Sequence, residues 1–60
     1  MSIRDLSYIL NEAINVVVLN QGGRLVDMYD GKESISDEFM DREIDQIIKV
    51  TFNTIWVKIK

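Results

Sequence analysis

The last fourteen residues, IIKVTFNTIWVKIK (47–60), alternate apolar and polar side chains on either side of a central Asn-Thr. Alternation with a period of two is typical of a half-buried β-strand, and Asn is favoured in tight turns. A two-residue turn at Asn53-Thr54 would place six apolar residues on one face as cross-strand pairs. These pairs are Phe52 with Ile55, Val50 with Val57, and Ile48 with Ile59. The segment therefore predicts a C-terminal β-hairpin whose six apolar residues belong to the core.

The other face of this hairpin carries five candidate binding residues: Lys49, Thr51, Trp56, Lys58 and Lys60. In the same register Lys49 lies opposite Lys58, and like charges directly across an antiparallel pair are destabilising. Three interpretations of this face stay open. The lysines guard a solvated edge, or they dock on an acidic segment of a second subunit within 37–45, or they contact nucleic-acid phosphates while Trp56 stacks on a base.

The first half of the chain predicts a helix followed by a hairpin. Ser2 and Asp5 have the spacing of a helix capping box, and apolar residues recur at helical spacing over 3–12. The segment INVVVLN (14–20) predicts a strand with two apolar faces, which is typical of a central strand or of one covered by a partner. A Gly-Gly turn then leads into a return strand, RLVDMY (24–29).

The acidic middle of the chain predicts a second, shorter helix over 37–43. Ser36 is a favourable N-cap, and the two acidic residues after it suit the positive end of the helix dipole. Ile35 before this cap and Met40 after it have the spacing of a hydrophobic staple. We therefore expect Phe39 and Met40 to pack inward.

The length and composition of the chain favour one domain, residues 1–60, that associates with other copies. Sixty residues bury only about 60% of the unfolded surface, so a lone domain of this size is marginally stable. The sequence has no Cys and no His, which excludes disulfides, zinc-thiolate sites and the commonest general base. Association remains as the stabiliser. We expect an α+β domain in which an N-terminal helix, a β-hairpin, a short helix and a C-terminal β-hairpin form one antiparallel sheet. This sheet would mediate a homodimer or a dimer of dimers.

Charge is segregated along the chain. Residues 27–45 hold eight acidic and two basic residues, a net charge of −6, whereas residues 46–60 hold three lysines and no acid. The net charge of the whole chain is −3, which argues against a general nucleic-acid binder. The basic segment 46–60 still allows a local positively charged surface. No segment approaches the ~20 apolar residues of a membrane span, and no targeting signal is visible. We expect a cytoplasmic protein without membrane contact.

Without His or Cys, an active site would depend on carboxylates, Tyr or Lys. Two groups of acidic residues could hold Mg²⁺ through one or two carboxylates and water, as phosphodiester-cutting sites do. They are Asp27, Asp30 and Glu33, and Asp41, Glu43 and Asp45. Asp27 and Asp41 are thus the candidate catalytic residues. A solvated acidic surface is the alternative interpretation, and neither group matches a specific metal-binding motif.

The order of VVVLN (16–20), LVDMYDG (25–31), DEFMDREID (37–45) and IIKVTFNTIWVKIK resembles small proteins encoded by Firmicutes prophages, among them clostridial anti-CRISPR proteins. The resemblance implies a sheet-plus-helix fold like that of the transcriptional-coactivator single-strand-binding family, and assembly through the sheets. It further implies phage counter-defence in a host bacterial cell, by acting on or through DNA, for instance by metal-assisted nicking of supercoiled plasmid.

Two other functions stay open beside this nickase hypothesis. One is a non-enzymatic homo-oligomeric binding module that inhibits or sequesters a host protein through its acidic surface. The other is a purely structural role in an assembly.

Overall fold

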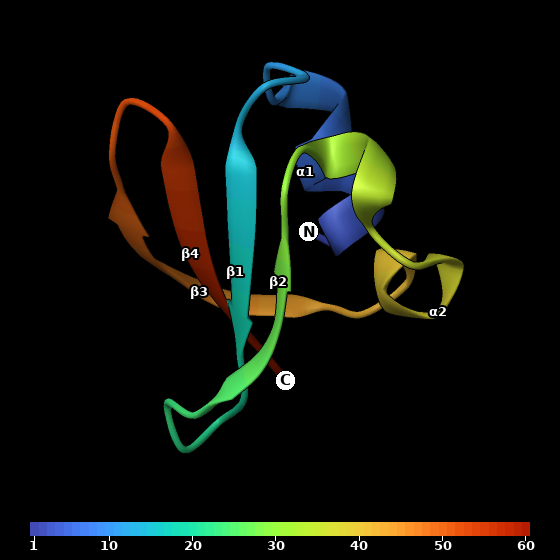
Figure 1. Cartoon of the computed structure of the whole chain (residues 1–60). Coiled ribbons are helices and arrows are strands. Elements are labelled where there is room, and N and C mark those ends of the chain that lie inside the picture. The colour runs from blue at the N-terminus through green and yellow to red at the C-terminus, as the bar shows by residue number, and fades with distance from the viewer.

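The computed structural model describes residues 1–60 as a small α+β domain with one four-stranded mixed sheet (Figure 1). The elements are α1 (Ile3–Ile9), β1 (Asn15–Leu19), β2 (Leu25–Tyr29), the 3₁₀ turn η1 (Lys32–Ser34), α2 (Asp37–Met40), β3 (Ile44–Val50) and β4 (Thr54–Ile59). The strand order is β2-β1-β4-β3, and both helices lie on the same side of the sheet. The predicted order of helix, hairpin, short helix and hairpin is confirmed.

The sheet is mixed and not wholly antiparallel, which corrects one part of the prediction. Each hairpin is antiparallel, but the two hairpins meet through β1 and β4, which run parallel. The reason is the connection from β2 to β3, which carries η1 and α2 across one face of the sheet. A crossover of this kind returns the chain to the end of the sheet where β2 began, so β3 runs in the same direction as β2. β1 is central, as its two apolar faces predicted.

The capping box at the start of α1 is confirmed. The Ser2 hydroxyl accepts a hydrogen bond from the Asp5 N–H at 3.2 Å, and the Asp5 carboxylate accepts one from the Ser2 N–H at 3.0 Å. The helix ends at Ile9 and not at residue 12, because Leu10 is extended. The Lys32 ammonium donates to two carbonyl oxygens of the last turn, at 2.8 and 2.9 Å. The carbonyl oxygens of Ser7 and Leu10 therefore accept hydrogen bonds although no further turn of helix follows.

The helix α2 is also shorter than predicted, with four residues in place of seven. Ser36 stands at the N-cap position, and Phe39 and Met40 pack against the core as expected. The chain leaves the helix after Met40 because its next residues pair with the N-terminus: the Ile3 N–H donates to the Arg42 carbonyl at 3.0 Å. The backbone groups that would extend α2 are used in this isolated β-bridge instead.

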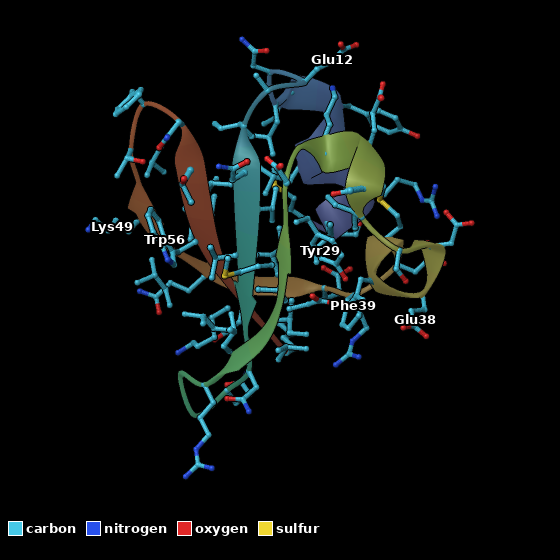
Figure 2. All side chains as sticks on the ribbon, viewed as in Figure 1. Glu12, Tyr29, Glu38, Phe39, Lys49 and Trp56 are labelled. Carbon is cyan, nitrogen blue, oxygen red and sulfur yellow. The ribbon has the colours of Figure 1, made fainter.

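The core lies between the helices and one face of the sheet. Its nine buried residues come from every layer: Ile3, Leu6, Val16, Val18, Tyr29, Ile35, Ile55, Val57 and Ile59. Five partly buried apolar residues pack around them: Leu10, Ile14, Phe39, Met40 and Ile44. The Phe39 ring meets the Tyr29 ring edge-on at 6.1 Å and ties α2 to β2 (Figure 2).

The turn of the C-terminal hairpin is centred on Phe52-Asn53, one residue earlier than the predicted Asn53-Thr54. The Thr51 N–H donates to the Thr54 carbonyl at 2.8 Å, and the Thr51 hydroxyl accepts from the Thr54 N–H at 3.2 Å. Phe52 and Asn53 therefore stand outside the ladder. The Asn53 carbonyl accepts the Asn15 N–H at 2.8 Å, so β1 holds the turn in place.

The register of β3 against β4 also differs from the prediction. Two β-bulges interrupt β3, and they bring Val50 opposite Ile55 and Ile47 opposite Val57. Each bulge inserts one extra residue on the bulged strand and shifts the alternation of its side chains. As a result, every third residue of β3, beginning at Ile44, lies opposite a buried residue of β4.

Half of the predicted hairpin core is confirmed. Ile55, Val57 and Ile59 are 3%, 0% and 2% exposed. Ile48, Val50 and Phe52 were expected beside them but are 47%, 61% and 97% exposed, so that part of the prediction is wrong. Phe52 lies in the turn, Ile48 lies at a bulge, and Val50 is the last residue of the edge strand β3.

Candidate functional site

The face of the sheet opposite the helices is not covered by any element of the chain, and we call it the open face. Residues of all four strands form it, alternate residues on β1 and β4 and residues spaced by three on β2 and β3: Asn15, Val17, Leu19, Leu25, Met28, Gln46, Lys49, Thr54, Trp56 and Lys58. Most of its centre is apolar. The open face is therefore a largely apolar layer that no second layer of the same chain covers.

An apolar hollow of about 770 Å³ lies on the open face. Its apolar walls are Val17 and Leu19 on β1, Leu25 and Met28 on β2, and Trp56 on β4. Leu25 and Met28, on the edge strand β2, are 59% and 64% exposed, and with their apolar neighbours they form an exposed apolar patch. The polar groups are confined to one end of the hollow, where Asn15, Asp30 and Thr54 lie.

Two of the cations predicted to bind are already engaged within the chain. The Lys49 Nζ lies 5.2 Å from the centroid of the Trp56 ring, a cation–π contact (Figure 2). The Lys58 Nζ lies 3.7 Å from an Asp45 carboxylate oxygen. The predicted pair of Lys49 opposite Lys58 is wrong, because the bulges place Lys49 opposite Trp56 and Lys58 opposite Gln46. No like-charge repulsion across the hairpin has to be offset.

The other two predicted binding residues lie elsewhere. The Thr51 hydroxyl donates to Asn53 Oδ1 at 3.2 Å and takes part in the β3–β4 turn, where it has a structural role. Lys60 lines a separate hollow beside Phe39 and Arg42. Of the five candidates, the open face therefore brings together only Lys49, Trp56 and Lys58.

The candidate catalytic carboxylates are also separated. Asp41 accepts a hydrogen bond from the Arg4 guanidinium at 3.2 Å, and this bond raises the pKa of Arg4 above its usual value. Asp27 accepts the N–H of the residue after it at 2.8 Å. Nowhere in the chain do three or more metal-ligating side chains meet. Glu43 and Asp45 point to the N-terminal ammonium and to Lys58.

Two buried polar atoms have no hydrogen-bond partner: Asn15 Oδ1 and the Tyr29 hydroxyl. Tyr29 is 7% exposed, and burial raises its pKa to about 12, with the nearby Asp27 carboxylate adding to the effect. The hydroxyl is therefore neutral in the folded protein at ordinary pH.

Sequence patterns did not indicate that Leu25 and Met28 share the open face. Strict alternation places them on opposite sides of β2, since they are three residues apart. The irregularity of the β1–β2 ladder at Val18 and Leu19 brings both to the same side. No residue in this stretch carries a local signal for such a bulge.

Comparison of the chain with protein-family models, with curated proteins and with solved structures gives no match. None of the helices has both the length and the apolar character needed to cross a membrane. The function of the open face therefore has to be argued from its geometry.

Proposed function

We propose that the chain is a non-enzymatic homo-oligomeric binding module in which two copies dock their open faces against each other. The observation that carries this proposal is the uncovered apolar face of a sheet whose two central strands are parallel. A sheet with one solvated face usually places apolar side chains toward the core and polar side chains toward water. Here β1 and β4 are covered by helices on one face alone. A second copy supplies the missing layer.

The charges that flank the hollow favour a second copy as the occupant. Arg24 precedes β2 and Asp30 follows it, and neither forms an ion pair within the chain. Leu25 and Met28 lie between them. If the two-fold axis lies between the two open faces and perpendicular to the strands, β2 packs antiparallel over the partner's β2. Arg24 of each chain then lies beside Asp30 of the other, one such pair at each end of the strand. The surface is then complementary to itself.

The size of the open face suits such an interface. The molecule measures 27 × 22 × 17 Å, so its largest face has a flat footprint of roughly 600 Å². Side-chain relief adds to this area, and specific interfaces bury about 800 Å² per partner. Complete burial of Leu25 and Met28 would contribute about 1–2 kcal/mol each, given their exposed fractions. These two side chains are the expected centre of the interface.

Engagement of the two lysines favours protein docking over nucleic-acid binding at this face. A phosphate contact by Lys49 or Lys58 would compete with the Trp56 ring or with the Asp45 carboxylate. On the side of β2 and α2, four carboxylates have no ion-pair partner: Asp27, Glu33, Asp37 and Glu38. In the proposed module this acidic side faces outward and contacts a basic host protein, which the module inhibits or sequesters in the bacterial cytoplasm.

Sedimentation of the wild-type chain and of Met28→Asp tests the proposal. Wild type is expected to sediment as a dimer or a higher multiple of 7.0 kDa chains, and in Met28→Asp the open-face contact should dissociate at least about tenfold more readily, because the substitution buries a charge in this interface. Tyr8→Asp is the matched control, since Tyr8 is 74% exposed on α1. A wild-type monomer at micromolar concentration would overturn the proposal.

A plasmid assay separates this proposal from the nickase hypothesis. Supercoiled plasmid is incubated with the protein and Mg²⁺, and again with EDTA. Relaxation that EDTA abolishes, and that Asp27→Asn or Asp41→Asn reduces, would replace the binding module with a metal-assisted nickase. Intact plasmid together with no salt-sensitive DNA shift is the result that the binding module predicts.

A further inference from the structure

The outer edge of β3 is a second uncovered feature, distinct from the open face. β3 is an edge strand of the sheet, and only its first residue is paired on the outer side: the Ile44 N–H donates to the Met1 carbonyl at 2.8 Å. Past Ile44, residues 45–50 face no further strand. An edge of this kind presents a row of backbone donors and acceptors to any strand that can pair with it.

This edge is also apolar. Ile47, Ile48 and Val50 are 43%, 47% and 61% exposed, although each belongs to the longest strand of the sheet. Exposed apolar side chains on a long unpaired strand favour the addition of another strand. The stretch that is free to pair is residues 45–50. It is limited at Ile44 by the backbone hydrogen bond to Met1 and after Val50 by the turn.

We propose that β3 pairs antiparallel with the β3 of a second copy about a two-fold axis at Ile47, so that two sheets join into one. The charges of the strand favour this register. An axis at Ile47 sets Asp45 opposite the partner's Lys49 and Lys49 opposite the partner's Asp45. Opposite charges directly across a strand pair are stabilising. The same register sets Ile47 opposite the partner's Ile47.

Neighbouring registers are less favourable. An axis at Ile48 sets Lys49 opposite the partner's Ile47, and an axis at Gln46 sets Asp45 opposite the partner's Ile47. An axis at Lys49 would set two lysines against each other. Asp45 and Lys49 also lie on the same face of the strand, because Asp45 contacts Lys58 and Lys49 contacts Trp56, both on the open face. The proposed ion pairs are therefore compatible with the side-chain directions, and they exchange the Lys58 and Trp56 contacts within each chain for contacts across the axis.

Pairing at this edge has a consequence for the open face. The two-fold axis of an antiparallel strand pair is perpendicular to the sheet, so both open faces point to the same side of the joined sheet. Each pair of chains then presents two apolar hollows in one direction. If the open faces also dock, the two interfaces together generate a dimer of dimers or an open filament. The inference about β3 does not depend on the proposed function, because it uses the edge and not the face.

Charge reversal with variant mixing tests the inference. Lys49→Glu sets Glu against Asp across the two-fold axis, and Asp45→Lys sets Lys against Lys. Mixed in equal amounts, the two variants restore opposite charges at both pairs of a mixed dimer. We expect each variant alone to associate weakly, and the mixture at least about tenfold more tightly. Amides of residues 45–50 should gain protection from hydrogen exchange only in the mixture.

Both variants are made in the Met28→Asp background, which removes the open-face contact, and in the wild-type background. Restoration in the Met28→Asp background supports pairing at β3 even if the open-face proposal fails. A mixture that sediments like its separate components overturns the inference, and the bulges and Lys49 then protect a solvated edge. Asp45→Asn is the control for Asp45→Lys, because it removes the ion pair with Lys58 without placing a lysine opposite the partner's Lys49.

A second variant covers the case in which Asp45→Lys does not fold. In the Met28→Asp background, Ile47→Lys places two lysines at the proposed axis and should abolish the association, while its 43% exposure makes the substitution tolerable in one chain. Ile9→Lys is the matched control, since Ile9 is 71% exposed on α1. Equal association of the two variants would overturn the inference.

Discussion

The stability of the fold should fall at alkaline pH through the ionisation of Tyr29. Its pKa is raised by burial to about 12, against an ordinary value near ~10 in the unfolded chain. A raised pKa means that the folded state favours the neutral hydroxyl. The corresponding stability is fully present below pH ~10 and is lost as the pH rises through ~12. Two pKa units set an upper limit of about 3 kcal/mol on this loss. A domain with a free energy of unfolding near ~5 kcal/mol would lose a large part of it.

The assay is chemical denaturation followed by circular dichroism, at several pH values from 7 to 11.5, for wild type and Tyr29→Phe. The difference between the two free energies of unfolding isolates Tyr29, because the two proteins differ only in this hydroxyl. Tyr29→Phe should be as stable as wild type or up to about 1 kcal/mol more stable at pH 7, since the buried hydroxyl has no hydrogen-bond partner. Its advantage should grow above pH ~10.

Tyr8→Phe is the control for exposed tyrosine and should show no such trend. A difference between wild type and Tyr29→Phe that stays constant from pH 9 to 11.5 would refute the reasoning. The Tyr29 hydroxyl would then be accessible to water in the folded state.

Three further predictions concern the stability of the monomer, each measured by denaturation. Ser2→Ala should cost about 1 kcal/mol through loss of the capping box. The pKa of Asp5 is lowered by the Ser2 backbone N–H and hydroxyl, so this cost should shrink as the pH falls below 3.8. Lys32→Met should cost about 2 kcal/mol, because two carbonyls at the end of α1 lose a charged donor, and amide exchange should show the last turn opening. Ile55→Ala should cost about 3 kcal/mol, whereas Phe52→Ala should change stability by less than about 0.5 kcal/mol. Equal costs for the last two would favour the predicted Asn53-Thr54 turn over the observed Phe52-Asn53 turn.

The parts of the fold that sequence predicted correctly depend on local signals. The capping box needs only Ser2 and Asp5, three residues apart, and the structure forms both of its hydrogen bonds. The central position of β1 agrees with its run of apolar residues without alternation, which is typical of a strand whose two faces are both covered. The inward packing of Phe39 and Met40 follows from their place in an amphipathic turn.

Register and strand direction were not predictable, because they depend on contacts between distant residues. The alternation of 47–60 is compatible with more than one pairing, and the Thr51–Thr54 contacts and two bulges select the observed one. The parallel pairing of β1 with β4 depends on the path of η1 and α2 across the sheet. The helix lengths depend on Lys32 and on the N-terminal bridge, which act from far along the sequence.

The candidate site was predicted in part. Lys49, Trp56 and Lys58 share a face as predicted, although on β3 the bulges and not strict alternation place Lys49 there. The contacts of Lys58 with Asp45 and of Lys49 with the Trp56 ring also follow from the bulged register. Leu25 and Met28 share the open face because of an irregularity in the β1–β2 ladder, and no sequence signal indicates this irregularity. Direct evidence on this face therefore has to come from its own residues.

Trp56 provides that evidence, because it is the only tryptophan of the chain and lines the hollow on the open face. The decisive measurement is acrylamide quenching of Trp56 fluorescence over a dilution series from high to low micromolar protein. If two copies dock through their open faces, quenching should be weak at high concentration and should rise on dilution, and Met28→Asp should be strongly quenched throughout. Quenching that is independent of concentration in the wild-type chain would contradict the account.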